Sequence, residues 1–115
     1  MPLYRITSRQ LHPRGLLYEI AVAGRTIRVV VTGHASDRLS LWQRTEEQMF
    51  ETLLFPEEVV AGHRNRFIAH RRYDGHVLRV VYEYETDIPL VVTVYFPYVK
   101  RYFRGGGSYA DQIRS

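Results

Sequence analysis

The chain has 115 residues, a formal net charge of +4 and no cysteine. This length fits one domain with a modest hydrophobic core. The lack of cysteine excludes disulfides and thiolate metal sites.

The basic residues are almost all arginine, since Lys100 is the only lysine. Arginine binds phosphate through a planar fork, and the nine tyrosines offer rings on which bases can stack. This composition favours RNA as a partner, although a GC-rich or thermophilic genome is an equally good explanation. The N-terminus lacks the layout of a signal peptide, and no apolar run is long enough to span a bilayer. We therefore expect a soluble, cytoplasmic protein without a membrane partner.

The first part of the chain is rich in strand-forming residues. Residues 1–14 are ambiguous, with one strand-like run, LYRITSRQL. Residues 16–32 contain two β-rich runs separated by Ala23-Gly24, which predicts a hairpin. Residues 33–42 change to helical spacing, with their apolar side chains on one stripe.

A second helix is predicted to begin at Thr45 and to end before Pro56. Thr45 and Gln48 have the spacing of a capping box, in which each side chain bonds the other residue's backbone N–H.

Two further runs predict a three-stranded meander. Residues 66–84 form a hairpin around Asp74-Gly75, because this dipeptide accepts the backbone angles of a two-residue loop. Residues 90–96 follow as an apolar third strand.

The order of hairpin, two helices and meander predicts an α+β fold, with both helices on one face of an antiparallel sheet. The two-residue loop places His70 directly opposite Arg79, and both side chains then point to the face that no helix covers. Adjacent cations destabilise a sheet unless an anion lies between them, so the pair predicts a phosphate site.

Four segments resemble a family of small prokaryotic domains of undetermined function that is grouped with the BrnT and RelE toxins. These segments are GHASDRL, TEEQMFETLLFPEEVVAG, RFIAHRRYDGHVLRVVYEY and LVVTVYF. The resemblance covers residues 27–104 of a single domain. Residues 1–26 are then an N-terminal hairpin extension, and residues 105–115 a polar tail.

The resemblance implies a RelE/BrnT-like fold, cleavage of RNA without a metal ion, and neutralisation by a small antitoxin protein. It places a histidine and an arginine at the start of the first helix, here His34 and Arg38. The family's Arg-Gly-Ile-Ser between the helices is replaced by WQRT at residues 42–45.

Metal-free cleavage of RNA needs a base for the ribose 2′-OH, cations for the phosphate and an acid for the leaving 5′-oxygen. The candidates for these catalytic roles are His34, Arg38, His70, Arg79 and Tyr95. The candidates for binding the RNA strand are Arg66, Arg72, Tyr98, Lys100, Arg101, Tyr102 and Arg104. No histidines and carboxylates have the spacing of a ligand set, so the sequence predicts neither a metal nor a cofactor.

Plainer interpretations stay open. His34 can simply cap its helix or pack at the sheet edge, and His70 can be an incidental member of an exposed charged ladder with Arg66 and Glu83. The basic C-terminal stretch can bind an acidic segment of an antitoxin instead of RNA. The main alternative function is a non-catalytic module of the same fold that binds nucleic acid or protein. A homodimer is also left open.

Overall fold

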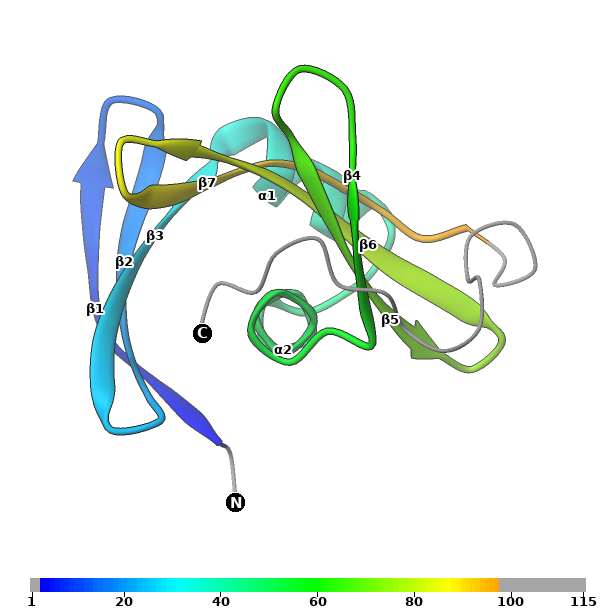
Figure 1. Cartoon of the computed structure of the whole chain (residues 1–115), viewed down its shortest axis with the longest axis horizontal. Coiled ribbons are helices and arrows are strands. Elements are labelled where there is room, and N and C mark those ends of the chain that lie inside the picture. The colour runs from blue at the N-terminus through cyan, green and yellow to red at the C-terminus, as the bar shows by residue number, and fades with distance from the viewer. Residues whose placement is uncertain (1–2, 98–115) are drawn as a thin grey trace.

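The computed structural model describes residues 3–97, which form one curled sheet and two short helices (Figure 1). The strands are β1 (Tyr4–His12), β2 (Gly15–Val22), β3 (Arg25–Thr32), β4 (Glu58–Ala61), β5 (Phe67–Tyr73), β6 (His76–Glu85) and β7 (Ile88–Tyr95). The helices α1 (Gly33–Leu41) and α2 (Glu46–Leu54) follow one another between β3 and β4. No helix in this part of the chain is long and apolar enough to cross a membrane.

The sheet has the strand order β1-β2-β3-β7-β6-β5-β4, and it is mixed because β3 and β7 pair in parallel. The structure is 57% strand, with only two short helices. The expected α+β fold, a RelE/BrnT-like antiparallel sheet with two helices packed on one face, is therefore wrong. The N-terminal hairpin is also part of the main sheet instead of an extension to it.

Two strands that the sequence left ambiguous or unassigned, β1 and β4, lie at the edges of the sheet. β4 has only four residues, too few to give a periodic signal. The register of β1 shifts between Ile6 and Ser8, which interrupts its alternation of apolar and polar residues. Edge strands are commonly short or bulged, because these features discourage pairing with other chains. The same features hid both strands from sequence analysis.

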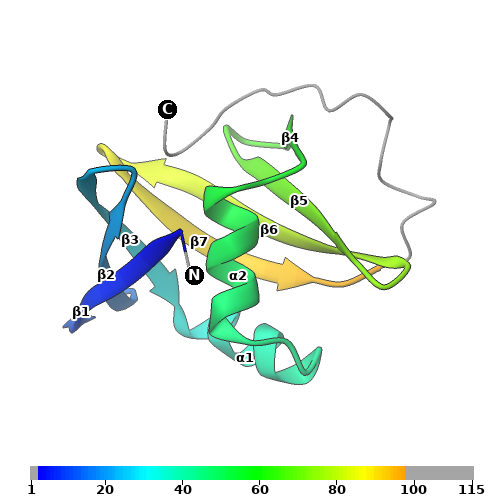
Figure 2. The same ribbon diagram turned by 90° about the horizontal axis from the view of Figure 1, so that it is seen from below.

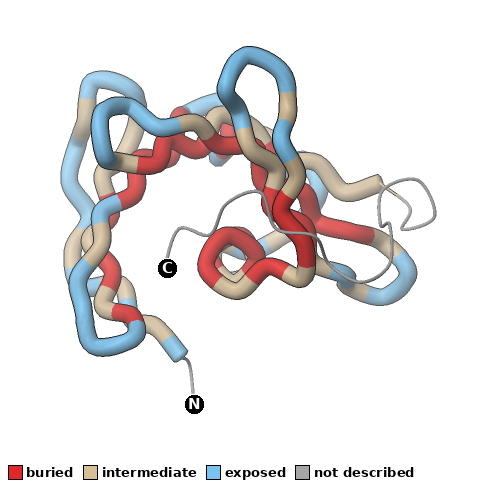
Figure 3. Tube along the Cα trace, in the orientation of Figure 1, coloured by how far each residue is buried: buried red, intermediate tan, exposed pale blue. Residues whose placement is uncertain are grey.

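The sheet curls around α2, which lies inside the curve (Figures 1 and 2). Phe50, Leu53 and Leu54 of α2 belong to one buried core cluster together with Tyr82 of β6. Burial of a side chain of this size stabilises the fold by about 1.5–3 kcal/mol relative to an exposed position. Figure 3 shows that the buried residues lie along α2 and the central parts of the strands. The core therefore fills the inside of the curve.

Short-range hydrogen bonds fix where both helices begin. Thr45 accepts a bond from the Gln48 N–H at 3.1 Å, and the Gln48 side chain accepts one from the Thr45 N–H at 3.2 Å. This arrangement confirms the predicted capping box. At α1, the Thr32 hydroxyl accepts a bond from the Ala35 N–H at 3.1 Å, so the helix begins directly at the end of β3.

The β5–β6 hairpin has the predicted register, with Tyr73 paired to His76 across the loop. Asp74 and Gly75 have φ angles of +50° and +82°, as a two-residue hairpin loop requires. This register determines which side chains of β5 and β6 share a face.

Candidate functional site

Four polar side chains lie in a row across β4, β5, β6 and β7. Glu58 on β4 pairs with His70 on β5. His70 in turn pairs with Arg79 on β6, and Arg79 pairs with Tyr95 on β7. Side chains of directly paired residues share a face of the sheet and lie about 5 Å apart at Cβ. We call this set the Glu58–Tyr95 row.

The row lies on the face of the sheet that points away from α2. The neighbouring residues on β5 and β6, Ala69 and Val80, are buried in the core cluster. Because side chains alternate along a strand, His70 and Arg79 project from the opposite face. The sequence predicted this orientation correctly.

The expectation that this face is open is wrong. Glu58 and His70 are each 1% exposed and Arg79 is 7% exposed, whereas Tyr95 is half-buried. β4, which the sequence did not predict, places Glu58 against His70 from one side. The Tyr95 ring covers Arg79 from the other, with its centroid 4.8 Å from the guanidinium carbon. The row is therefore most enclosed at β4 and most accessible at β7.

Burial and the neighbouring Arg79 charge both lower the pKa of His70. Burial disfavours the charged imidazolium, and the Arg79 charge repels it, so the pKa of His70 falls from 6.5 to about 4. At neutral pH the imidazole is uncharged, and one ring nitrogen can accept a proton. An anion beside Arg79 would offset the repulsion and raise this pKa again.

Glu58 is the member of the row that sequence analysis missed. Its Oε1 atom is buried and accepts no hydrogen bond within the described part of the chain. An unsatisfied buried polar group costs about 1–3 kcal/mol, and more when it is charged, so such groups in a native structure call for an explanation. The sequence signal for Glu58 is an acidic residue followed by two valines. It indicates a site residue only once these residues are recognised as a strand.

His34 and Arg38 are not members of the row. Both lie on α1, whose buried residues pack into the core cluster with those of α2. α1 contacts β7 and β3, and neither side chain forms a hydrogen bond or ion pair with residues 3–97. Three of the five predicted catalytic residues thus come together, namely His70, Arg79 and Tyr95.

Two predicted RNA-binding arginines take part in ion pairs. Arg66 lies 3.6 Å from the Glu83 carboxylate on β6. Arg72 donates to Glu57 from its side chain at 3.1 Å and from its backbone N–H at 2.7 Å. The other predicted RNA-binding residues lie outside the described residues: Tyr98, Lys100, Arg101, Tyr102 and Arg104.

The row offers a carboxylate, an imidazole, a guanidinium and a phenol side by side. Carboxylate and imidazole groups transfer protons, and a guanidinium binds phosphate through charge-assisted hydrogen bonds. No group of three or more histidine and acidic side chains within residues 3–97 is placed to hold a metal ion. Proton transfer next to a bound phosphate is the chemistry that these groups suit.

No protein-family model matches the chain, and neither curated proteins nor solved structures give a match. The resemblance to the BrnT and RelE toxins therefore stays a prediction. Any assignment of function depends on the geometry of the Glu58–Tyr95 row.

Proposed function

We propose that the protein is a metal-independent endoribonuclease for single-stranded RNA, with the Glu58–Tyr95 row as its active site. In the cell it acts as a cytoplasmic toxin that a small antitoxin protein neutralises. The observation that carries the proposal is the adjacency of Glu58, His70 and Arg79 on three neighbouring strands, in a buried environment. The neutral imidazole supplies the base, the carboxylate supports the imidazolium that forms, and the guanidinium binds the phosphate.

In this reaction Arg79 binds the scissile phosphate. Its charge is then shared with the anion, so the neighbouring His70 becomes a stronger base. Neutral His70 takes the proton from the ribose 2′-OH, and Glu58 stabilises the imidazolium that forms. The 2′-oxygen bonds to phosphorus, and the bond from phosphorus to the 5′-oxygen breaks. The Tyr95 hydroxyl gives its proton to that oxygen, which leaves a 2′,3′-cyclic phosphate and a free 5′-OH.

Burial sets the direction from which RNA approaches. Exposure along the row is lowest at Glu58 and His70 and highest at Tyr95. The RNA strand therefore enters over β7, where the Tyr95 ring already stacks on the Arg79 guanidinium. Bases stack readily on such rings while cations hold the backbone.

The near-complete burial of Glu58 and His70 favours a second candidate function. In this alternative the protein binds a nucleic acid or a protein through Arg79 and Tyr95 without cleaving RNA. Glu58 and His70 then only orient Arg79. Both functions predict binding, so the two are distinguished by whether RNA is cleaved.

One assay separates them. Labelled single-stranded RNA is incubated in EDTA with the wild type, Glu58→Gln, His70→Gln and Arg79→Lys, and with Arg28→Ala as a control. Arg28 is exposed on β3, outside the row. We expect the wild type and Arg28→Ala to leave cyclic-phosphate ends, and each row variant to lower kcat/KM by about 100-fold.

Circular dichroism and thermal unfolding establish that each variant is folded. Equal cleavage by all folded variants would overturn the assignment of the row. Binding without cleavage by the wild type would favour the non-catalytic alternative.

A further inference from the structure

A groove between β1 and α2 lies on the concave face of the sheet, whereas the Glu58–Tyr95 row lies on the other face. It has a volume of about 800 Å³ and is lined by Leu3, Tyr4, Ile6, Thr45, Glu47, Gln48, Glu51 and Phe55. Figure 2 shows β1 beside α2 on this side of the molecule. We call this feature the β1–α2 groove.

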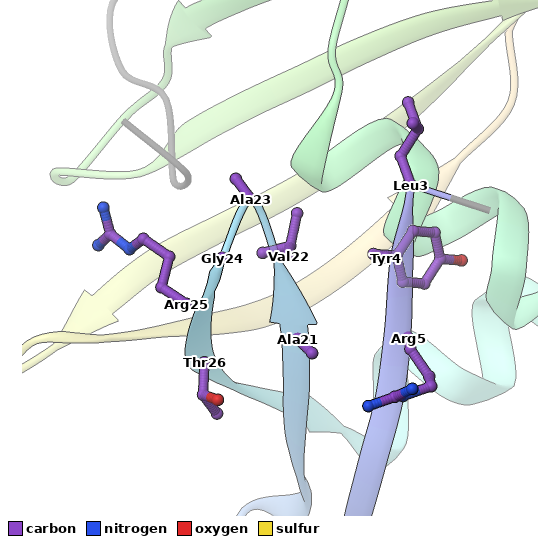
Figure 4. Close-up of a pocket in the computed structure, with 9 residues that line it drawn as sticks. All are labelled: Leu3, Tyr4, Arg5, Ala21, Val22, Ala23, Gly24, Arg25 and Thr26. Atoms are coloured by element: carbon purple, nitrogen blue, oxygen red, sulfur yellow. The ribbon is translucent and has the colours of Figure 1, made fainter. Parts of the chain in front are cut away.

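A second, shallower hollow continues the groove across the start of β1. It has a volume of about 580 Å³, lies over the tip of the β2–β3 hairpin and shares Leu3 and Tyr4 with the groove (Figure 4). The indented surface therefore follows the edge of the sheet on both sides of Tyr4.

β1 offers its backbone to a further strand. Within the described part of the chain it pairs with β2 alone, so the N–H and C=O groups along its other edge face no strand. An unpaired edge of nine residues is a template for an added strand. Leu3 and Leu11 at its two ends are 72% and 91% exposed, and a partner would cover this apolar surface.

α2 gives the groove a negative rim. Glu47 is exposed and forms no ion pair with residues 3–97. The neighbouring Glu46 is already paired with Arg9 at 2.7 Å, so Glu47 carries the uncompensated charge. Burial, followed by the charges of Glu47 and Glu51, raises the pKa of Tyr4 to about 12, as expected for a phenol in a negative field.

We propose that the β1–α2 groove binds an extended basic segment of a protein partner, which adds to the outer edge of β1 as an eighth strand. Alternate side chains of such a segment point inward. On this inward face an apolar side chain packs on Ile6, and a lysine or arginine side chain two residues along the segment pairs with Glu47. The sheet curls around α2 (Figure 1), and the added strand continues this curl over the groove.

The chemistry of the groove disfavours two other occupants. RNA is repelled by the negative rim, because its own backbone is anionic. A second copy of this chain is disfavoured at the strand edge, since antiparallel pairing of β1 with itself about Thr7 sets Arg5 opposite Arg9. The inference is independent of the proposed ribonuclease, because it uses none of the residues of the row.

Three labelled peptides test the proposal by fluorescence anisotropy. The first is a blocked seven-residue peptide, Thr-Lys-Thr-Val-Thr-Lys-Thr, in which lysine and valine share one face of the strand and threonine occupies the other. The second carries N-methyl groups on every second residue, which removes the N–H donors that face β1 and keeps the charge. The third has glutamate in place of lysine. We expect the first to bind, and the other two to bind at least about tenfold more weakly.

Two variants of the protein supply a matched comparison. Glu47→Lys reverses a charge at the groove, and Asp37→Lys makes the same change at an exposed position of α1 that does not line it. Glu47→Lys should weaken binding of the lysine–valine peptide by about tenfold or more, and Asp37→Lys by less than about twofold. Amide NMR signals of β1 should shift in the wild-type complex.

Absence of binding by the lysine–valine peptide would overturn the proposal. So would equal affinity for the glutamate peptide, or an equal effect of both charge reversals. Equal affinity for the N-methylated peptide would overturn strand addition. Sedimentation that shows a dimer lost on Ile6→Lys substitution would assign the edge to a second copy instead.

Discussion

His70 lies directly opposite Arg79 in the β5–β6 hairpin, and both side chains are buried. Two cations in these positions would repel each other. The repulsion is avoided because burial and the Arg79 charge keep the imidazole neutral, with its pKa lowered to about 4. The pair is therefore one cation beside one neutral proton acceptor.

This neutral state predicts that the fold loses stability in acid. Between pH 6.5 and pH 4 the unfolded chain binds a proton on this histidine that the folded chain does not, so stability rises with pH. From pH 7 to pH 5 we expect the free energy of unfolding to fall by about 2 kcal/mol through this group. Urea denaturation at both pH values measures the change. In His70→Gln the loss should be smaller by that amount, and an undiminished loss would contradict the prediction.

Tyr95→Phe separates the two roles proposed for Tyr95. The ring over Arg79 is kept and the hydroxyl is lost. We expect RNA binding within about twofold of the wild type and cleavage slowed by about 100-fold, because general acids contribute on that scale. Tyr95→Leu removes the ring as well and should weaken binding too. Gel-shift assays and single-turnover rates measure the two effects. Normal cleavage by Tyr95→Phe would mean that another group donates the proton.

Gly15→Ala should destabilise the β1–β2 turn strongly. A Cβ atom at this position would lie 2.1 Å from the Val31 carbonyl oxygen, which belongs to the backbone of β3. We expect a loss of about 3 kcal/mol in the free energy of unfolding. Gly24→Ala is the control, since its φ is +76° but no atom lies within 4 Å of the added carbon. Backbone strain alone should cost about 1 kcal/mol there. Equal losses in chemical denaturation would refute the steric argument.

Thr45→Ala should lower stability by about 1 kcal/mol, because the Gln48 N–H loses its acceptor at the start of α2. Thr45→Ser keeps the hydroxyl and should restore most of the loss. Thermal unfolding of the three proteins tests this, and identical midpoints would show that the cap contributes nothing.

Local chemistry explains which elements the sequence predicted. The Asp74-Gly75 loop fixes the register of its hairpin, and the Thr45–Gln48 capping box marks the start of α2. The parallel pairing of β3 with β7 has no such signal, because it depends on the path of the chain through two helices and three strands. The observed architecture differs from the predicted one because of that pairing and because of the two edge strands, β1 and β4.

The residues of the candidate site also divide into those with a local sequence signal and those that depend on pairing between distant strands. The shared face of His70 and Arg79 follows from the turn between them, so sequence analysis found it. Glu58 reaches His70 only through the pairing of β4 with β5, which a four-residue strand does not reveal. The enclosure of the face depends on that same pairing and was missed with it.

The pairing of Val30 with Leu90 also bears on how fast the protein folds. Each half of the sheet, β1–β3 and β4–β7, is a series of hairpins between strands adjacent in the chain. Within residues 3–97, β3 and β7 are the only strands whose pairing joins the two halves. Forming this pairing restricts a long stretch of chain, and the entropy cost is paid before the new contacts compensate it. We therefore expect the pairing of β3 with β7 to limit the refolding rate, and both series of hairpins to form before it.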